Sequence, residues 1–399
     1  MNTLKFTGKD PIVRGLVKNE ALAKLLALKK LGEELEQDFA GITPNVFVEK
    51  HNYPNHSIGF LSTPSYNHND DVKVWVAEKK SISDIVGVRA RLVNSFFSPA
   101  RTDFDKLKQD AQLATLSPKP VDQEINLAEK PWSRIMFKGD ATPVGPKIAL
   151  KSTELSHVRV PVAVRNIVDD GDLKASPGAY SLYKKYDNYF ATKVFSLGNL
   201  GQEKRRRIVP TRWSITAVDN TLYREMIPEI RRNEISPGKV YFGGHLGNYF
   251  VLVFLPSMYR YELHEIYTGS GKVTDSVVRS NTDHEEYRGR KDYAEDTAGG
   301  YYAARLPIIE KLFAEKKQAS VLALRFITSE YSVPLGVWVV REAVRNALGN
   351  CVLESNEVPE LVKKAEEIIQ QRFIEHAHTF IKQTWLFREG LQQKQISDY

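Results

Sequence analysis

The sequence predicts a mixed α/β fold with a central sheet, flanking helices and a long C-terminal helix. Two apolar runs, Tyr249–Leu255 and Ser320–Phe326, have the length and β-branched content of buried strands. Between them, Gly299–Ala314 has the apolar spacing of a helix. From Val358 to Phe387, apolar residues recur on roughly one face, which is typical of one long amphipathic helix. Because strands alternate with helices, a mixed α/β domain is expected.

The other elements follow from local patterns. Residues 19–38 place leucines three or four positions apart and predict a helix, whereas residues 42–64 and 71–78 alternate apolar with polar residues and predict short strands. Six prolines in residues 101–165 indicate irregular connecting structure. Residues 177–195 predict a helix whose tyrosine stripe packs on the core, an interpretation favoured over a base-stacking platform. The remaining predictions are strands at Val240–Phe242 and Leu335–Val340 and a helix at Arg341–Leu348.

These elements predict three parts of the chain. Residues 1–165 form an N-terminal region with a helix, short strands and a proline-rich layer, and residues 166–390 form the C-terminal α/β core with its terminal helix. Residues 391–399 are a polar tail, which we expect to be flexible.

Composition restricts the class of protein. A chain of 399 residues with 42% hydrophobic and 26% charged residues is expected to be globular. It has no uninterrupted apolar run of about 18 residues and no apolar signal core, so a cytoplasmic protein without a membrane partner is expected. A single cysteine, Cys351, excludes an internal disulfide and a cysteine-based zinc site. The net charge of +7 favours a polyanionic partner such as nucleic acid.

The run Lys204, Arg205, Arg206 and Arg207 is the clearest candidate for DNA binding. Four contiguous cations can contact several phosphates, and each contact adds to a salt-sensitive affinity. A solvated charged loop without a partner is the alternative interpretation.

A second polar cluster follows this run. Arg212 and the hydroxyls of Thr211 and Ser214 have the chemistry to bind a phosphate, and Asp219 has the chemistry to bind a divalent metal. Glu225 is a further candidate carboxylate. A buried polar network that fixes a turn is the alternative.

A third cluster lies before the predicted helix at 299–314. Thr297 is a candidate helix cap, and Gly299 and Gly300 leave the first backbone amides accessible to an anion, with Arg290 and Lys291 nearby. Glycines at a helix start also mark close packing against a strand, and this alternative stays open.

A glycine-rich turn at 243–248 presents the imidazole of His245, a candidate catalytic group, and the amide of Asn248, a candidate ligand-binding group. We expect Arg212, His245 and Arg290 to line one cleft, because each lies among residues more useful to a polar ligand site than to a core.

Five segments carry long and specific motifs: FSLGNLG (195–201), RRRIVPTRWSITAVDNTL (205–222), GRKDYAEDTAGGYYAARLPIIE (289–310), KKQASVLALR (316–325) and YSVPLGVWVVREAVRNAL (331–348). They closely resemble the archaeal Nre family of DNA-repair proteins, and FVEKHNYPNHSIG (47–59) and VDDGDLKA (168–175) are weaker matches to it. The resemblance covers most of the chain from about Pro44 to Leu348.

The resemblance implies an archaeal protein of the DNA-damage response that is tied to the sliding clamp PCNA by a motif at the extreme C-terminus. Here Gln393, Ile396 and Tyr399 fit the pattern Q-x-x-[aliphatic]-x-x-[aromatic]. Such a peptide orders on the clamp, with its aliphatic and aromatic side chains as anchors. Clamp-binding motifs usually carry two adjacent aromatics, whereas this one ends after the first, so a plain polar tail is the alternative. Many family members begin with a cysteine-rich segment that this chain lacks, so no zinc-dependent role is carried over.

Two functional hypotheses result. The first is a DNA-repair accessory factor that binds DNA through its basic surface and is recruited by the clamp. The second is a metal-dependent enzyme acting on nucleic acid or a nucleotide, in which Asp219 with Glu225 or Asp296 holds a divalent metal such as Mg²⁺ and Arg212 and Arg290 hold phosphate. The sequence assures no cofactor and no set of metal ligands.

Overall fold

The computed structural model describes residues 36–50, 56–67, 70–99, 105–131, 144–274 and 278–390. They form two compact units, and the division between Glu225 and Met226 falls inside helix α8 (Thr211–Ile230). The sequence predicts a boundary near residue 165 instead. The structural boundary lies later because the helical segment that follows residue 165 is bonded to the first unit: Gln112 donates to the carbonyl of Leu197 (3.0 Å), and Asn199 donates to Thr115 (3.0 Å).

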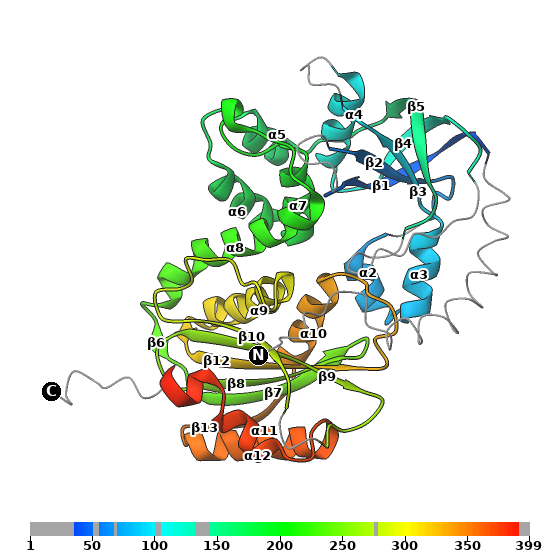
Figure 1. Cartoon of the computed structure of the whole chain (residues 1–399). Helices are drawn as coiled ribbons and strands as arrows, with labels where there is room; N and C mark the ends of the chain where they lie inside the picture. The colour runs from blue at the N-terminus through cyan, green and yellow to red at the C-terminus, as the bar shows by residue number, and fades with distance from the viewer. Residues whose placement is uncertain are drawn as a thin grey trace. The chain divides into compact units, whose positions relative to one another are not determined.

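The N-terminal unit is built on a closed five-stranded barrel (Figure 1). Its strands are connected in the order β1-β2-β3-β5-β4, and β4 pairs back onto β1. Helix α4 lies between β3 and β4 in the chain, and the helices α2 and α3 lie between β2 and β3. The bounds are β1 Asp38–Val48, β2 Ile58–Thr63, α2 Val72–Ala77, α3 Ile82–Ala90, β3 Val93–Phe97, α4 Lys106–Thr115, β4 Val121–Leu127 and β5 Lys147–Ser156.

Alternation along the strands separates the interior of the barrel from its outer face. Val46, Val48, Ile58 and Phe60 point inward and pack with residues of α4 in one hydrophobic core. A buried polar network also lies inside, where Gln123 of β4 accepts hydrogen bonds from the hydroxyls of Thr43 in β1 and Ser62 in β2. Intervening residues therefore face outward.

A layer of helices follows the barrel in the same unit. It comprises α5 (Val162–Asp169), α6 (Ala175–Lys185), α7 (Asn188–Ser196), the 3₁₀ turn η1 (Glu203–Arg205) and the first part of α8. The helix expected at 177–195 is divided into α6 and α7, because Asp187 accepts a hydrogen bond from the amide of Phe190 (2.7 Å) and caps a new helix start.

The C-terminal unit contains a six-stranded sheet in the order β10-β9-β12-β8-β7-β13 (Figure 1). Strands β9 and β12 are parallel, and the other neighbouring pairs are antiparallel. The bounds are β6 Glu234–Ile235, β7 Gly238–His245, β8 Asn248–Leu255, β9 Arg260–Gly269, β10 Asn281–Glu285, α9 Gly299–Glu315, β11 Lys317–Gln318, β12 Ser320–Thr328, α10 Trp338–Leu348, β13 Cys351–Ser355, α11 Val358–Arg372, α12 Ala377–Lys382 and η2 Leu386–Gly390. The predicted mixed α/β class is confirmed.

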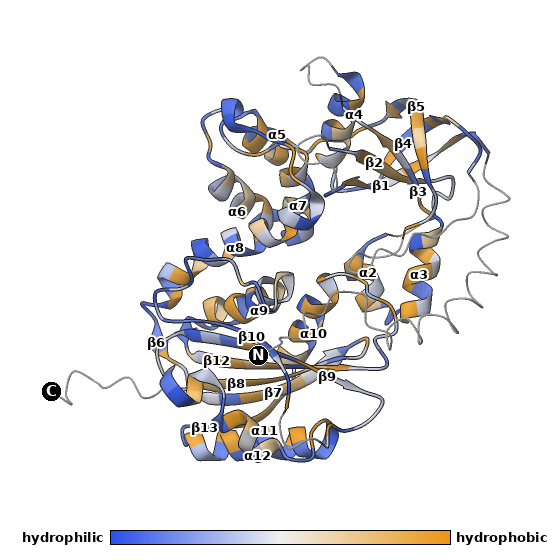
Figure 2. Cartoon of the chain, viewed as in Figure 1, coloured by the Kyte–Doolittle hydropathy of each residue, from blue (hydrophilic) through white to orange (hydrophobic). Residues whose placement is uncertain are grey.

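Helices cover both faces of this sheet. Val251, Val253 and Leu255 pack with α11 and α12 in one core, whereas the alternate residues of β8 point to the face covered by α9 and α10. Figure 2 shows the resulting hydrophobic colouring along the central strands. Burial on both faces explains why β8 and β12 read as continuous apolar runs in the sequence. Among the described residues, no helix combines the length and apolar character that crossing a membrane requires.

The prediction of a single long C-terminal helix at 358–387 is wrong. Helix α11 ends at Arg372, and the chain then runs through a break into α12 and the short π-helical segment η2. At the break, the amide of Val273 donates to Phe373 O (2.8 Å), and the amide of Glu375 donates to Val273 O (2.9 Å). These bonds use backbone groups that a continuous helix would need.

Three shorter predictions are also wrong. Residues 72–77 form helix α2 instead of a strand, because Asp71 accepts from the amide of Lys73 (2.8 Å) and caps it. The strand expected at Leu335–Val340 is not formed, because Trp338–Val340 is the first turn of helix α10. Residues 101–165 contribute α4, β4 and β5 to the barrel instead of an irregular layer. The helix expected at 19–38 lies outside the described residues up to residue 35, and Asp38 already belongs to β1.

We expect Phe326→Ala to destabilise the C-terminal unit by about 3–5 kcal/mol, because removing a buried aromatic leaves a cavity. The Phe326 ring is fully buried and stacks on Phe373 with centroids 4.3 Å apart. Urea denaturation followed by circular dichroism measures the effect. Met258→Ala, which changes an exposed side chain of the same unit, should cost less than about 0.5 kcal/mol. Equal costs for the two variants would contradict this view of the core.

The stability of the N-terminal unit should rise above pH 8 because of Lys193. Burial lowers the pKa of its ammonium to about 8, although Asp187 and Asp71 act in the opposite direction. Between this value and the ordinary 10.5, the unfolded chain binds more protons, so the free energy of unfolding increases with pH. Lys193→Met should lose that increase. Urea titrations of both proteins from pH 7 to 10 measure the difference, and a difference independent of pH would refute the shift.

Candidate nucleic-acid interface

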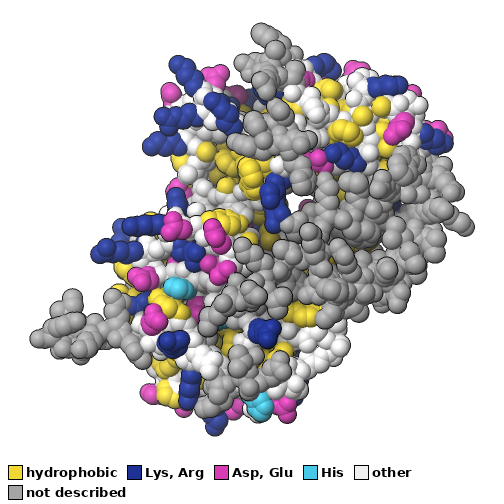
Figure 3. Space-filling model, viewed as in Figure 1, with side chains coloured by type: hydrophobic (Ala, Val, Ile, Leu, Met, Phe, Trp, Pro, Cys, Tyr) yellow, Lys and Arg dark blue, Asp and Glu magenta, His cyan; other side chains and the backbone are white. Residues whose placement is uncertain are grey.

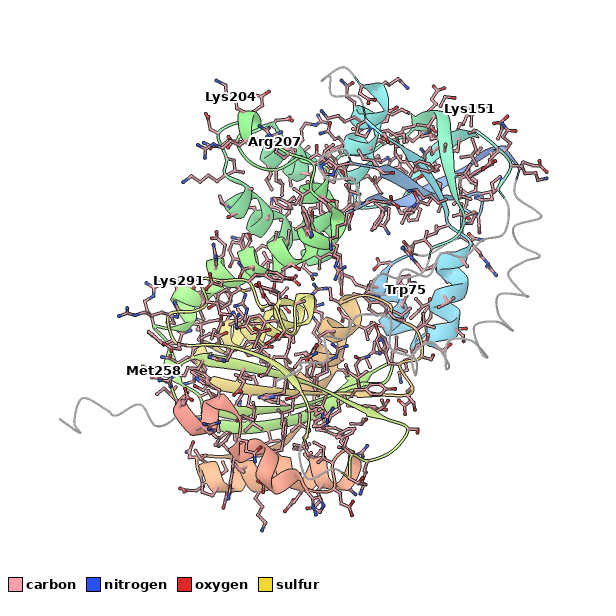
Figure 4. All side chains as sticks on the ribbon, in the orientation of Figure 1. Trp75, Lys151, Lys204, Arg207, Met258 and Lys291 are labelled. Carbon is pink, nitrogen blue, oxygen red and sulfur yellow. The ribbon has the colours of Figure 1, made fainter. Side chains whose placement is uncertain are left out.

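Three of the four cations in the run 204–207 are exposed. Lys204 and Arg205 lie in η1, and Arg207 lies just after it, where its guanidinium donates to the carbonyls of Lys204 and Arg206. Figure 4 shows Lys204 at the outer edge of the N-terminal unit. Among the described residues, none of these three cations forms an ion pair with a carboxylate, so their charge is available to a ligand.

Arg206 has a structural role instead. Its guanidinium donates to the carbonyl oxygens of Gly201 (2.8 Å) and Val168 (2.6 Å), and the residue is half-buried. These bonds join the η1 segment to the end of α5. Arg206, one of the four cations predicted to bind DNA, therefore stabilises the fold through these hydrogen bonds.

Further cations surround η1. Residues 157–210 contain ten Lys and Arg against five Asp and Glu, so this layer carries a net +5 of the chain's +7. Figure 3 shows Lys and Arg side chains gathered at the edge of the unit where α5, α6 and η1 lie. The exposed members of this group, here called the basic layer, are Arg159, Arg165, Lys174, Lys184, Lys185, Lys204, Arg205 and Arg207. Lys184 and Lys185 are adjacent in sequence, and Lys204, Arg205 and Arg207 belong to the run 204–207, whereas the other members are isolated, so the run alone does not reveal the whole group.

The cluster at 211–214 begins helix α8. Thr211 Oγ1 accepts a hydrogen bond from the amide of Val48 (2.9 Å), which ties α8 to β1. Ser214 is buried, and its hydroxyl donates to Pro210 O (3.2 Å). Arg212 is exposed. The hydroxyls of Thr211 and Ser214 therefore form hydrogen bonds within the protein, in agreement with the alternative of a buried polar network that fixes a turn.

Asp219 and Glu225 do not face one another. They lie six residues apart on α8, which places them about 120° apart around the helix axis. Asp219 is buried and Glu225 is exposed. Within the described part of the chain, no group of three His, Cys, Asp or Glu side chains is arranged to hold a metal ion.

In the C-terminal unit, Asp283 organises the loop before α9. Its carboxylate accepts hydrogen bonds from the amide and the hydroxyl of Thr297 (both 2.8 Å) and forms an ion pair with Arg290 (3.0 Å). Arg290 also donates to the carbonyls of His284 (2.8 Å) and Tyr293 (3.2 Å). Arg290 and Thr297 thus fix the loop, whereas Lys291 stays exposed (Figure 4).

Close packing accounts for the glycine at position 300. A Cβ on Gly300 would overlap Glu265 Oε1. The carboxylate of Glu265, which lies on β9, therefore already occupies the space beside the start of α9. Glu265 pairs with Arg325, whose guanidinium also donates to Asn248 Oδ1. Gly299 is half-exposed beside this network. The geometry favours the close-packing alternative for Gly300 over a free anion site.

A third buried pair lies on the same face of the sheet. Arg305, 2% exposed, donates to Glu285 Oε2 (2.6 Å), and Tyr259 donates to Glu285 Oε1 (2.6 Å). Burial raises the pKa of the neighbouring Tyr261 and Tyr301 hydroxyls well above the ordinary value. Sequence motifs do not reveal this pair, although the charged Arg305 within the apolar helix 299–314 is a signal for it.

The expected cleft does not bring His245 and Arg290 together. His245 ends β7, and Arg290 pairs with β10, which lies four strands away, or about 19 Å at ordinary strand spacing. His245 packs edge-on against Trp338, and burial lowers the pKa of its imidazole. Arg212 belongs to the other unit. The tail residues Gln393, Ile396 and Tyr399 lie outside the described residues.

The two units thus differ in what they offer a ligand. Most candidate residues of the C-terminal unit are engaged in internal hydrogen bonds and ion pairs, whereas the basic layer of the N-terminal unit presents cations to solvent. Such a surface attracts phosphate groups through charge alone, in a way that salt weakens.

Comparison with known proteins assigns the chain to a family. A model described as "Archaeal Nre, N-terminal" matches residues 15–272, and one described as "Archaeal Nre, C-terminal" matches residues 285–399. No solved structure is significantly similar to the chain.

Three curated relatives match over most of their length. "DNA repair protein NreA" of Haloferax volcanii is 32% identical over 350 residues, which cover 83% of each chain. "DNA repair protein NreA" of Archaeoglobus fulgidus is 34% identical over 315 residues, covering 76% of this chain and 78% of the relative. "DNA repair protein NreB" of the same organism is 32% identical over 321 residues, covering 78% and 80%. The chain therefore belongs to the archaeal Nre family.

Proposed function

We propose that this protein is a DNA-repair factor of the cytoplasm that binds DNA through the basic layer of its N-terminal unit. The observation that carries the proposal is the concentration of a net +5 charge in residues 157–210, with exposed cations on α5, α6 and η1. The printed names of the three relatives support the repair role. Because the contacts are to phosphates, the binding is independent of base sequence.

Recruitment to the sliding clamp PCNA is the second part of the proposal. The pattern of Gln393, Ile396 and Tyr399 stands at the end of the chain, after the last described element, η2. The base of this tail is held in the C-terminal unit: the Glu262 carboxylate accepts hydrogen bonds from the amides of Trp385 (2.9 Å) and Leu386 (2.8 Å). Short peptide motifs of this kind bind by ordering on the surface of a partner.

Replacing Lys204, Arg205 and Arg207 together by Ala should weaken binding to all DNA sequences alike. If each cation contacts one phosphate, the slope of log K against log salt flattens by up to about 3 units. Fluorescence anisotropy with a labelled duplex at several salt concentrations measures the slope.

The matched control replaces Lys363, Lys364 and Lys382 in α11 and α12 by Ala, which removes the same net charge from the other unit. Its slope should equal that of the unchanged protein. If both triple variants lose the same amount, total charge rather than the basic layer governs binding, and the proposed surface is wrong.

Deleting residues 393–399 should abolish binding to the host's own clamp and leave DNA affinity nearly unchanged. Tyr399→Ala alone should weaken clamp binding about tenfold or more, because losing a buried anchor costs at least about 1.4 kcal/mol. Ser397→Ala, at a position that the pattern leaves open, serves as the control. Calorimetry with the purified clamp measures these affinities. Undiminished binding by the deleted protein would exclude the tail as the clamp-binding element.

A further inference from the structure

The topology of the N-terminal barrel is that of an oligonucleotide-binding (OB) fold. Five strands close in the order β1-β2-β3-β5-β4, β3 pairs in parallel with β5, and helix α4 connects β3 to β4. Barrels of this kind bind single-stranded nucleic acid or oligosaccharide on the outer face of their second and third strands. Because a fold alone does not establish a ligand, the residues on that face decide the matter.

Two aromatic rings flank a glycine on the outer face. Phe47 of β1 is paired with Gly59 of β2, and Gly59 is paired with Phe96 of β3. Both phenylalanines are half-buried and point away from the barrel core, in which their neighbours Val46, Val48 and Phe97 pack. The two rings stand two strands apart, about 10 Å, with no side chain on the strand between them. The segment 47–59, which resembles the Nre family, begins and ends at two of these three positions.

An amide with unused hydrogen-bonding capacity lies between the rings. Asn94 is 6% exposed, and its Oδ1 is buried without a hydrogen-bond partner in the described structure. A Cβ on Gly59 would overlap this oxygen, so the amide lies over the glycine. A buried polar atom without a partner costs free energy, and a ligand that bonds to it recovers that cost.

A cation completes the arrangement. The Lys147 ammonium lies 4.3 Å from the centroid of the Phe96 ring and forms an ion pair with Glu49 (2.7 Å). Lys147 begins β5 and is paired with Asn94 across the parallel β3–β5 ladder. Aromatic faces, an amide and a cation are the groups that single-stranded binders combine: rings stack on bases, amides bond to base edges and cations contact phosphates.

We propose that the outer face of β1, β2 and β3 binds single-stranded DNA, with Phe47 and Phe96 stacking on bases, Asn94 bonding to a base edge and Lys147 contacting the backbone. This inference rests on the proposed DNA-binding function and names its substrate class. The basic layer then supplies salt-sensitive attraction to any DNA, while the barrel selects unpaired strands, whose bases are open to stacking.

Phe96→Leu tests the proposal, because leucine retains apolar volume but has no aromatic face. With a fluorescein-labelled oligo-dT of about 15 nucleotides, the full-length variant should bind at least about fivefold more weakly than the unchanged protein. Its affinity for a duplex of the same length should not change. Phe96→Trp should restore oligo-dT binding. Equal oligo-dT affinity for the leucine variant and the unchanged protein would overturn the proposal.

Lys147 has a matched control on its own strand. Lys147→Gln should flatten the salt dependence for oligo-dT by about 0.7 units, the value for one phosphate contact on a single strand, whereas Lys151→Gln on β5 should leave it unchanged. Equal effects of the two variants would contradict a role for Lys147.

A measurement on the unchanged protein guards against variants that fail to fold. Photo-crosslinking with an oligonucleotide that contains 5-iododeoxyuridine should label peptides containing Phe47 or Phe96, and labelling confined to other peptides would overturn the assignment. Tighter binding of oligo-U RNA than of oligo-dT would overturn the choice of DNA. If the unchanged protein binds a duplex but not oligo-dT, this inference alone is wrong, whereas failure of the unchanged protein to bind any DNA would remove the proposed function as well.

Discussion

A buried charge needs a partner, and this requirement decides which polar residues of the chain remain for a ligand. On one face of the C-terminal sheet, Asp283, Glu265 and Glu285 each pair with an arginine. The arginines come from the loop before α9, from β12 and from α9, so the pairs join elements that are distant in sequence. Removing one member would leave an uncompensated ion in the interior. Most candidate site residues of this unit are thus explained by the fold itself.

The N-terminal unit meets the same requirement differently. Among its buried charges, Arg89 pairs with Asp70 (2.6 Å) and Glu49 pairs with Lys147 (2.7 Å), while the half-buried Arg206 is held by carbonyl oxygens. Its other cations in the layer 157–210 are mostly exposed, and the buried amide oxygen of Asn94 has no hydrogen-bond partner in the described structure. The exposed cations and the amide oxygen of Asn94 therefore coincide in the unit that contains the barrel. This coincidence is why both proposed DNA contacts belong to it.

Local patterns in the sequence predict much of the C-terminal unit, because β8, β12 and α9 owe their form to apolar periodicity. Local patterns do not predict the structure where it depends on hydrogen bonds to residues far away in the sequence. Ile374 has helical spacing, yet the backbone around it pairs with Val273, about a hundred residues earlier. Local patterns do not predict the barrel, because its closure joins β1 to β4 across some eighty residues. Likewise, the run at 204–207 predicts a basic surface, but only tertiary contacts show that Arg206 is not part of it.

Hydrogen–deuterium exchange of the full-length protein, with and without single-stranded DNA, tests the central claim that the N-terminal unit holds the DNA. One experiment reports on the backbone amides of both units at once. The account predicts slower exchange in β1–β3 and in residues 157–210, with β9, β10 and the start of α9 unchanged. Slower exchange confined to β9, β10 and the start of α9 would place the DNA on the polar face of the C-terminal sheet and contradict the account.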